Sequence, residues 1–407
     1  MRLLYITPYV PSPIRTRPYN LIRALVRLGH RITLLTAAGT GPEDQRQADM
    51  LREWGVEVET FSVPAARSLW NCLRALPTYE PLQAVYAYHP QMERRLRTLL
   101  RESVFDIVHI EHLRAARLVR AVKGHPVVYD AVDCITFLFE QTARASPERA
   151  ARWKARLDLA RTRRYEARLL TQFDHVVVTS RRDKEALEAL ARRYLPPEAR
   201  PAPVTVVANG VDLEYFRPLE GDGRDPHTVV FTGKMSYHAN VAGVLYFARE
   251  VLPRIWAKAP YVRFQIVGKD PPESVRRLAA DGRIEVTGYV EDLRPYLARA
   301  GVAVCPALYA VGIQNKVLEA MAMATPVVCS RAAFAGLQAE AGRDALVADD
   351  PDTFAEYVLR LCTDPDRARR LGEAGRRYVE AHHDWEDSAR QLTAVYEAAR
   401  AGKKEAV

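Results

Sequence analysis

The sequence of 407 residues has no long hydrophobic run, no cysteine framework and no low-complexity tract. Because a transmembrane helix needs roughly 18 consecutive apolar residues, we expect no membrane span. The five cysteines are scattered and odd in number, without a CxxC pair, which favours reduced structural thiols over disulfides or a zinc site. The apolar stretch Leu3–Thr7 is followed at once by prolines and arginines, so it does not resemble a signal peptide. The remaining composition, 48% apolar and 27% charged, is that of a globular protein.

Charge is distributed unevenly along this chain of net charge +9. Residues 1–200 carry 33 Lys and Arg against 22 Asp and Glu, a balance of +11. The rest of the chain holds the remaining 26 basic and 28 acidic residues, a balance of −2. A basic half is typical of proteins that meet nucleic acid, an anionic membrane or an acidic substrate. The basic residues are not interleaved with stacking aromatics, so nucleic acid is not the partner we expect.

Short apolar strands alternate with segments of helical periodicity, which predicts parallel sheets with crossover helices. The alternation resumes after Gly221–Pro226, a stretch of linker composition, so we expect two α/β domains in tandem with the ligand in the cleft between them. Gly29 is expected to end the first helix as its C′ residue. The expected strands are Leu3–Thr7, Ile32–Thr36, Val56–Phe61, Ile107–Ile110, Val127–Tyr129, Val176–Thr179, Val204–Val207, Thr228–Thr232, Val262–Val267, Ile284–Thr287, Val302–Cys305 and Pro326–Cys329.

The first loop, Pro8–Tyr19, brings Arg15 and Arg17 to a helix N-terminus, an arrangement that suits a phosphate. The loop has no glycine, so it is neither a GxGxxG fingerprint nor a P-loop. A solvated basic loop is the alternative interpretation.

Two later strands of the first half also end in polar residues. Glu111 and His112 follow one of them and can supply hydrogen bonds or acid–base chemistry, although a structural hydrogen-bonding role fits equally well. Asp130 and Asp133 follow the next and can bind sugar hydroxyls. Since no further ligand stands at suitable spacing, we expect no metal.

The strongest motif is Gly312–Val328, in which a glycine-led turn feeds a short Ala-rich helix and then a strand. The amides of the turn and Lys316 suit a diphosphate, and Glu319 can accept hydrogen bonds from vicinal hydroxyls such as those of ribose. Two earlier strands end at Gly233-Lys234 and at Gly268, where a glycine allows close backbone approach to an anion.

With these motifs the chain resembles, over nearly its whole length, the retaining GT-B glycosyltransferases of family 4, the glycosyl transferases group 1 type. The segments that carry the resemblance are Leu4–Pro8, Arg27–His30, Asp106–His109, Phe173–Ser180, Asn209–Asp212, Phe231–Gly233, Val286–Val290 and Leu318–Ala322. The resemblance implies two Rossmann-like domains facing across a cleft, at residues 1–200 and 201–384, with a last helix in residues 385–407 that returns to the first domain. It also implies metal-independent transfer, with retention, from a nucleoside diphosphate sugar to a cell-envelope or exopolysaccharide acceptor, without a cofactor.

The resemblance further implies roles for individual residues. Glu319 would hold the donor ribose, Gly233 and Lys234 the diphosphate, and Tyr289 with Val290 the base. The donor-binding set is Arg15, Arg17, Gly233, Lys234, Gly268, Tyr289, Val290, Gly312, Ile313, Asn315, Lys316 and Glu319. The catalytic set is Glu111, His112 and Lys316, with no metal ligand.

The sequence departs from the family pattern at four places. The family's Gly-Gly turn is absent from the loop around Arg15–Arg17, and its arginine and lysine pair after the first strand of the second domain is reduced to Lys234. Val311 stands where many relatives carry a glutamate, and Lys316 replaces a common proline, which is typical of a Gly-Ile-Gln-Asn-Lys branch. Two other functions stay open: a catalytically silent GT-B partner of another transferase, and a different GT-B enzyme such as a nucleotide-sugar epimerase or a phosphorylase.

The stretch Arg144–Arg168 holds nine basic residues against Glu148, Asp158 and Glu166. Trp153, Leu157 and Ala160 fall on one face of the expected helix. Such a helix can lie on anionic lipid, so we expect a cytoplasmic protein, peripheral on the inner face of the membrane, with a lipid-linked or saccharide acceptor. A solvated helix packed on the sheet is the alternative.

Overall fold

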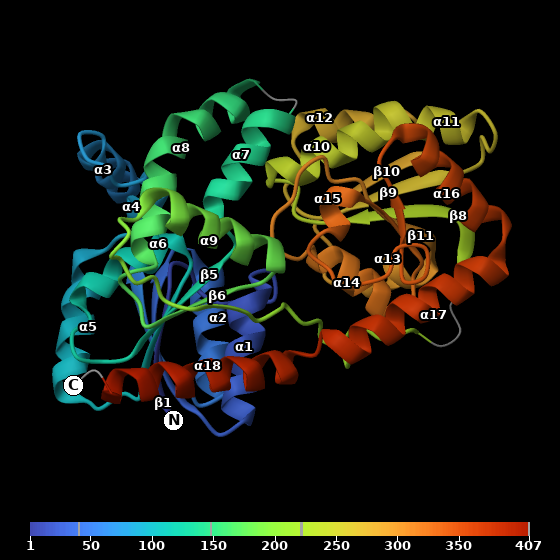
Figure 1. Cartoon of the computed structure of the whole chain (residues 1–407). Coiled ribbons are helices and arrows are strands. Elements are labelled where there is room, and N and C mark those ends of the chain that lie inside the picture. The colour runs from blue at the N-terminus through green and yellow to red at the C-terminus, as the bar shows by residue number, and fades with distance from the viewer. Residues whose placement is uncertain (40, 147–148, 220–222, 406–407) are drawn as a thin grey trace. The chain divides into compact units, whose positions relative to one another are not determined.

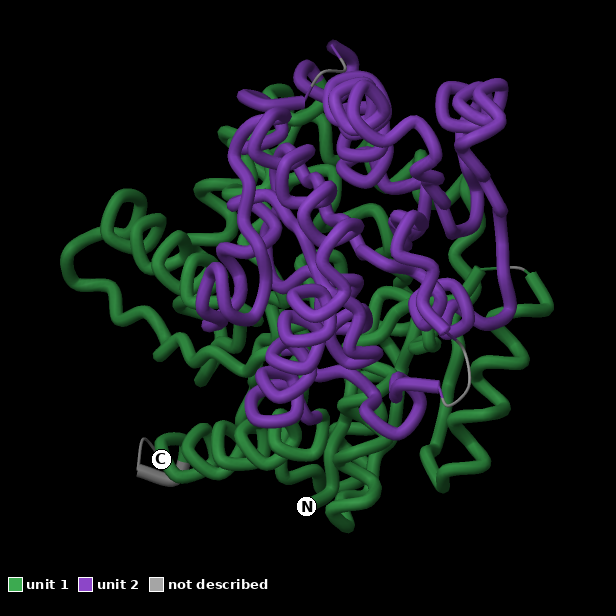
Figure 2. The backbone as a smooth tube through the Cα atoms, turned by 90° about the vertical axis from the view of Figure 1, so that its right-hand side faces the viewer, with its two compact units in different colours: residues 1–140, 154–208, 385–407 green, residues 141–153, 209–384 purple. Residues whose placement is uncertain are grey.

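The computed structural model describes residues 1–39, 41–146, 149–219 and 223–405. The chain forms two compact units. Unit 1 comprises Met1–Glu140, Lys154–Ala208 and Trp385–Val407, and unit 2 comprises Gln141–Trp153 and Asn209–Asp384 (Figure 2). The chain therefore contributes Gln141–Trp153 to unit 2, returns to unit 1, builds the rest of unit 2 from Asn209 and comes back to unit 1 with its last helix.

Unit 1 is built on a seven-stranded parallel sheet with the order β3-β2-β1-β4-β5-β6-β7. The strand order reverses between β1 and β4, which is the place where open parallel sheets bind ligands. The strands are β1 Arg2–Thr7, β2 Arg31–Ala38, β3 Glu57–Ser62, β4 Ile107–Glu111, β5 Val127–Val132, β6 His175–Val178 and β7 Val204–Val206.

Helices cover both faces of this sheet, so successive residues of β1 point into two different cores. Leu3 and Tyr5 pack in the core shared with α1 and α18, whereas Leu4 and Ile6 pack in the core of the opposite face. The red α18 lies beside the blue α1 in Figure 1. The helices are α1 Thr16–Arg27, α2 Pro42–Glu53, α3 Ala65–Ala75, α4 Leu82–Tyr86, α5 Pro90–Glu102, α6 Leu113–Ala116, α7 Ile135–Ala145, α8 Arg149–Leu169, α9 Arg181–Tyr194 and α18 Trp385–Glu405, with a 3-10 turn at Arg117–Ala121. The end of α7 and the start of α8 belong to unit 2.

Unit 2 repeats the same plan with a six-stranded parallel sheet of order β10-β9-β8-β11-β12-β13. Here the order reverses between β8 and β11. The strands are β8 Asp225–Thr232, β9 Arg263–Val267, β10 Ile284–Gly288, β11 Ala300–Cys305, β12 Val327–Ser330 and β13 Leu346–Ala348. The helices are α10 His238–Tyr246, α11 Leu252–Trp256, α12 Glu273–Arg276, α13 Arg294–Arg299, α14 Asn315–Ala322, α15 Arg331–Phe334, α16 Pro351–Thr363 and α17 Pro365–His382, with a π turn at Phe247–Val251 and a 3-10 turn at Arg277–Ala280.

Helix ends follow the local sequence. Gly29 has φ +82° just after α1, and its amide bonds back to the Val26 carbonyl oxygen at 2.9 Å, so its predicted C′ role is confirmed. Ser180 caps α9 by accepting from the amide of Asp183. Asp350 caps α16 in the same way, by accepting from the amides of Asp352 and Thr353.

The twelve predicted strands are confirmed, and β13 is the strand that the sequence did not predict. It has only three residues, Leu346–Ala348, too short to show a periodicity. The domain boundary at residue 200 needs correction: β7 pairs with β6, so the residues up to Ala208 belong to unit 1. The linker at 221–226 is also shorter than predicted, because β8 begins at Asp225; residues 221 and 222 lie outside the described residues.

Candidate functional site

The carboxyl edge of the unit 2 sheet is built on two glycines whose backbones nearly touch. Gly233 follows β8 with φ +156°, and Gly268 follows β9 with φ +153°. A Cβ atom on Gly268 would lie 1.9 Å from the Gly233 carbonyl oxygen. One on Gly233 would lie 2.8 Å from the Asn240 Nδ2 atom and 3.2 Å from Lys316 Cε. Glycine is therefore required at both turns, and the Lys316 side chain lies against the first of them.

Lys316 stands in the first turn of α14. Its ammonium nitrogen lies 3.2 Å from the Gln314 carboxamide oxygen and 5.7 Å from the centre of the Phe231 ring. Across residues 1–39, 41–146, 149–219 and 223–405, no carboxylate forms an ion pair with this nitrogen within 4.0 Å. With a neutral amide as its hydrogen-bond partner, the Lys316 ammonium group is suited to pair with an incoming anion.

Glu319 lies one turn further along α14, on the side of the helix that Lys316 shares. Burial raises the pKa of its carboxyl to about 7, and the charge of Lys316 acts in the opposite direction. The residue as a whole is only half-buried. A carboxylate in such a place gains by accepting hydrogen bonds from hydroxyl groups.

Asn315 is the first residue of α14 and is held by a chain of hydrogen bonds within unit 2. Asn209 donates from Nδ2 to the Asn315 side-chain oxygen at 3.1 Å. The Asn209 carbonyl oxygen in turn contacts His383 Nδ1 at 2.7 Å, and Tyr378 contacts His383 Nε2 at 2.8 Å. These contacts fix the start of the helix that carries Lys316 and Glu319.

The turn before α14 is tightly packed. Gly312 has φ +59°, in the left-handed region, and a Cβ atom on Gly336 would lie 2.0 Å from the Gly312 carbonyl oxygen. Val311 and Ile313 are both buried. The residue that replaces the family's usual glutamate, Val311, therefore serves packing here.

The remaining predicted donor residues of unit 2 follow the same strand ends. Lys234 is exposed next to Gly233, and its carbonyl oxygen accepts from Asn240 Nδ2 at 2.8 Å. Tyr289 is 70% exposed beyond β10, and Val290 is half-buried beside it. The structure thus places Gly233, Gly268, Lys316 and Glu319 around α14, with Tyr289 and Val290 at the neighbouring strand end.

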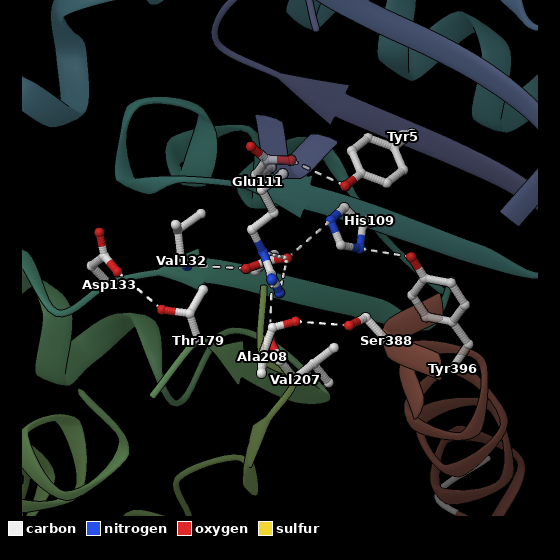
Figure 3. A network of polar contacts seen from close by, with 12 residues as sticks. Tyr5, His109, Glu111, Val132, Asp133, Thr179, Val207, Ala208, Ser388 and Tyr396 are labelled. Atoms are coloured by element: carbon white, nitrogen blue, oxygen red, sulfur yellow. Dashed lines mark hydrogen bonds and ion pairs between the residues drawn. The ribbon is translucent and has the colours of Figure 1, made fainter. Parts of the chain in front are cut away.

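In unit 1 the corresponding edge is occupied by an internal polar network (Figure 3). Arg17 forms an ion pair with Asp130 at 2.8 Å and donates to the Val207 carbonyl oxygen at 3.0 Å. Arg17 is 4% exposed and Asp130 is fully buried. The predicted role of Arg17 in donor binding is therefore corrected: its guanidinium joins α1 to β5 and the segment after β7.

Glu111 belongs to the same interior. Tyr5 donates to its carboxyl at 3.0 Å and Tyr9 at 3.2 Å, and no part of its side chain is exposed. Burial, followed by the charge of Asp130, raises the pKa of Glu111 well above its usual value. A group enclosed in this way does not touch a substrate, so we withdraw Glu111 from the catalytic set.

His112 is half-buried, whereas Glu111 is fully buried, and the His112 backbone has φ +66° at the end of β4. Its Nδ1 atom accepts from the Arg114 amide at 3.2 Å. Burial, and then the charge of Arg114, lowers the pKa of His112 to about 3. The ring is therefore neutral at pH 7 with its proton on Nε2, a hydrogen-bond donor.

The end of β5, like the end of β4, has a residue with positive φ. Val132, a β-branched residue, has φ +65°, and its amide bonds to Asp130 Oδ1 at 3.0 Å. Strain of this kind is concentrated at functional sites. Asp133 follows, half-buried, and accepts from the Thr179 hydroxyl at 3.2 Å (Figure 3). Burial raises the pKa of Asp133.

Arg15 also keeps an accessible position. It is half-buried, donates to the Val10 carbonyl oxygen at 3.1 Å and lies over the Tyr9 ring at 4.5 Å. Arg15 therefore remains a candidate cation for a phosphate.

Sequence reasoning missed three residues that shape these edges: Asn209, Asn240 and Phe231. Asn209 and Phe231 were visible as parts of family motifs, but without a role of their own, and the contact of Asn209 with Asn315 spans 106 positions and leaves no local signal. Among the described residues, no cluster of three or more His, Cys, Asp or Glu side chains suits a metal ion, and no helix is long and apolar enough to cross a membrane.

Comparison with known proteins gives two family matches. A model described as "Glycosyl transferase 4-like domain" matches residues 14–210, and one described as "Glycosyl transferases group 1" matches residues 226–364. A phosphatidyl-myo-inositol mannosyltransferase from Mycolicibacterium smegmatis is 25% identical over 98% of this chain and 94% of its own length. An MMP alpha-(1->4)-mannosyltransferase from Mycolicibacterium hassiacum is 29% identical over 74% of this chain and 72% of its own.

Solved structures share the fold. Sucrose-phosphate synthase from Thermosynechococcus elongatus superimposes with a TM-score of 0.71 at 18% identity, covering 99% of this chain and 100% of that one. HepE from Anabaena, in complex with UDP and glucose, gives 0.68 at 14% identity, covering 98% and 100%. Two parallel Rossmann-like units of this kind define the GT-B class of glycosyltransferases. Within that class, the chain belongs to family 4, the glycosyl transferases group 1 type.

Proposed function

We propose that the enzyme takes a nucleoside diphosphate sugar as donor and binds it at the carboxyl edge of the unit 2 sheet. The observation that carries the proposal is the position of Lys316, against the Gly233 turn and one helical turn from Glu319. Lys316 and Lys234 meet the diphosphate, which also approaches the backbone at Gly233 and Gly268. Glu319 accepts hydrogen bonds from the ribose hydroxyls.

The rest of the donor lies along the same edge in this proposal. Tyr289, exposed beyond β10, and Val290 flank the base. Gly312 and Ile313 line the sugar, with Gly312 offering its backbone because the Ile313 side chain is buried. Asn315 is a positioning residue, since Asn209 holds it at the start of α14.

The proposed reaction breaks the bond between the anomeric carbon and the diphosphate and forms a bond from that carbon to an acceptor hydroxyl, with retention and without a metal. Negative charge develops on the departing diphosphate, and Lys316 stabilises it. His112 donates from Nε2 to an oxygen of the reacting sugar, a role that suits a ring neutral at pH 7.

Unit 1 is the acceptor domain in this proposal. The half-buried carboxyl of Asp133, at a strand end with strained backbone, is suited to an acceptor hydroxyl. The acceptor is a saccharide or a lipid-linked intermediate of the cell envelope or an exopolysaccharide. One relative is by name a phosphatidyl-myo-inositol mannosyltransferase, which supports a lipid-linked acceptor.

The protein is proposed to work on the inner face of the membrane, attached through Arg144–Arg168. Of the acidic residues in this stretch, Asp158 and Glu166 are buried, and Glu148 lies outside the described residues. Trp153 and Leu157 are 67% and 54% exposed, so this face of α8 is not packed on the sheet. Exposed apolar groups among cations are what an anionic lipid surface attracts.

A thermal-shift screen against UDP, GDP and ADP sugars tests the donor proposal. We expect one of them to raise the unfolding temperature of the wild type, and Lys316→Ala to abolish that shift while unfolding normally alone. Lys258→Ala, which removes an exposed lysine at the end of α11, is the matched control and should keep the shift.

The outcomes separate the alternatives. A wild type that binds none of the sugars supports the catalytically silent partner, and a Lys316→Ala variant with an unchanged shift contradicts the assigned site. Once a donor is found, the anomeric configuration of the product by NMR tests retention, and activity in the presence of EDTA tests metal independence. Conversion of the donor sugar without an acceptor would reveal an epimerase.

A further inference from the structure

One helix of unit 1 turns its apolar side outward. Leu69, Trp70 and Leu73 of α3 are 62%, 58% and 50% exposed, and Leu76, the residue after the helix, is exposed as well. Among the described residues, six of the fourteen large apolar side chains that are exposed lie between positions 69 and 86. Apolar exposure is therefore concentrated at α3 and the segment that follows it.

The inner side of α3 is small and polar. Its buried residues are Ser68 and Ala75, while Asn71 and Cys72 are half-buried between them. At 100° per residue these four lie on one side of the helix and the exposed leucines on the other. This reverses the usual amphipathic arrangement, in which large apolar groups face the core. The pattern has no explanation in the packing of unit 1.

The charges on this helix have one sign. Arg67 and Arg74 lie along the Trp70 edge of the outward arc of Leu69, Trp70, Leu73 and Leu76, and these six residues are named the α3 face. α3 contains no acidic residue. An apolar stripe edged only by arginines is complementary to a surface that is apolar inside and negatively charged outside.

α8 places further cations beside the α3 face. Arg161 donates from Nη2 to the Leu76 carbonyl oxygen at 2.8 Å, and Asp158 accepts from the Leu82 amide at 2.8 Å, so α8 lies along the segment after α3. Figure 1 shows α3, α4 and α8 together at the periphery of unit 1. Lys154 and Arg164 are exposed on α8, whereas Asp158 is buried.

We propose that the α3 face is the element that inserts into an anionic lipid bilayer, with the cations of α8 holding the headgroups beside it. The proposal rests on the membrane association put forward above and adds the residues that enter the apolar layer. A second copy of the chain is a poorer occupant, because a two-fold interface would bring two such faces together and α3 has no acidic residue to pair with the arginines. An acidic protein surface would satisfy the arginines but would leave the leucines and Trp70 without an apolar layer.

Co-sedimentation of the full chain with vesicles tests the proposal. The vesicles are equal parts phosphatidylglycerol and phosphatidylcholine, or phosphatidylcholine alone, each at low and at high salt. We expect the wild type to bind the anionic vesicles, and the double variant Leu69→Ser/Leu73→Ser to lower the partition coefficient about tenfold or more. Lys154→Ala/Arg164→Ala should weaken binding chiefly at low salt, where the headgroup charge is least screened.

Val104→Ser is the matched control, since Val104 is an exposed apolar residue of unit 1 that precedes β4, whereas α3 follows β3. It should bind like the wild type, and all variants should unfold at the wild-type temperature and keep the nucleotide-sugar shift. If Leu69→Ser/Leu73→Ser binds vesicles as the wild type does, α3 does not insert, although membrane association through α8 stands.

Three other results also overturn the proposal. Equal binding to both vesicle types removes the anionic surface as occupant. A concentration-dependent dimer that the double variant abolishes makes the α3 face a self-association surface. A wild type that binds no vesicles removes both this proposal and the membrane association, while the nucleotide-sugar screen decides the donor proposal independently.

Discussion

The two sheets have the same winding but use their carboxyl edges differently. In unit 2, Lys316, Lys234 and Glu319 stand at the edge and are half-buried or exposed. In unit 1, Arg17 and Glu111 stand at the equivalent edge and bind internal partners. Arg17 forms an ion pair with Asp130, and Glu111 accepts hydrogen bonds from two tyrosines. A charged residue after a parallel strand is therefore evidence for a site only when the fold leaves it without an internal partner.

The last helix adds contacts to the interior of unit 1. α18 returns to unit 1, and Tyr396 contacts His109 Nδ1 at 2.9 Å while Ser388 donates to the Ala208 carbonyl oxygen at 2.9 Å (Figure 3). In unit 2 the corresponding residues, Lys316 and Glu319, are instead carried by the short helix α14 at the edge itself. If the unit 1 edge serves stability and the unit 2 edge serves binding, substitutions at the first should change the free energy of unfolding and substitutions at the second should change donor affinity.

The largest effect is expected from Arg17→Met. The variant leaves the Asp130 carboxyl buried without its counter-charge, which costs about 3–5 kcal/mol of the free energy of unfolding. Urea unfolding measures the loss, and the nucleotide-sugar shift of the folded fraction should stay unchanged. The double variant Arg17→Met/Asp130→Leu should recover most of the stability, because no buried charge remains. Loss of donor binding in a variant of normal stability would break the comparison.

The second effect concerns the backbone of the unit 2 edge. In Gly268→Ala the new Cβ meets the Gly233 carbonyl oxygen at 1.9 Å, so one of the turns must move. We expect a loss of about 2 kcal/mol or more in the free energy of unfolding, together with weaker donor binding. Gly282→Ala is the control, since nothing lies within 4 Å of its Cβ position, and its effect should stay within about 0.5 kcal/mol. Normal donor affinity in Gly268→Ala would place the diphosphate elsewhere.

Most of the fold follows from the sequence because short apolar strands and helical periodicity leave a local signal. Leu3–Thr7, Gly29 and the strand preceding Gly233 were each predicted from their own neighbourhood. The segment boundaries were harder, since β7 joins unit 1 through pairing with β6 and not through its composition.

The sites were predictable only where function depends on the backbone. The glycines and Lys316 are marked by a turn and a helix start, which a sequence displays. Whether Arg17 and Glu111 are available to a ligand depends on their contacts with Asp130 and Tyr5, which lie more than 100 positions away along the chain. No spacing rule reports such contacts. The outward face of α3 could not be predicted either. The spacing of its apolar residues indicates a helix but does not tell which side of the helix faces the core.

A third prediction sharpens the role of Glu319 through pH. Since the pKa of this carboxyl is about 7, about half of it is protonated at neutral pH, and ribose hydroxyls bind the ionised form. The affinity for the best nucleotide sugar of the screen should therefore rise about tenfold from about pH 6 to about pH 8. Isothermal titration calorimetry measures it. Glu319→Gln should bind more weakly at the higher pH and show a flat profile; a profile that persists in this variant would assign the titration to another group.

The smallest effect is expected in the unit 1 network from Tyr396→Phe. His109 and Tyr396 are both fully buried, and burial, followed by the charge of Arg17, lowers the pKa of His109, so the ring is neutral and accepts from the tyrosine hydroxyl at Nδ1. Removing the hydroxyl leaves that nitrogen without a donor and should cost about 1 kcal/mol of the free energy of unfolding in urea. Tyr79→Phe, whose side chain is 75% exposed, should cost nothing measurable. Because His109 and Tyr396 lie fully buried inside unit 1, neither variant should change the nucleotide-sugar affinity. A change in affinity for Tyr396→Phe would mean that the interior of unit 1 is coupled to donor binding, and the division between a stabilising edge and a binding edge would no longer hold.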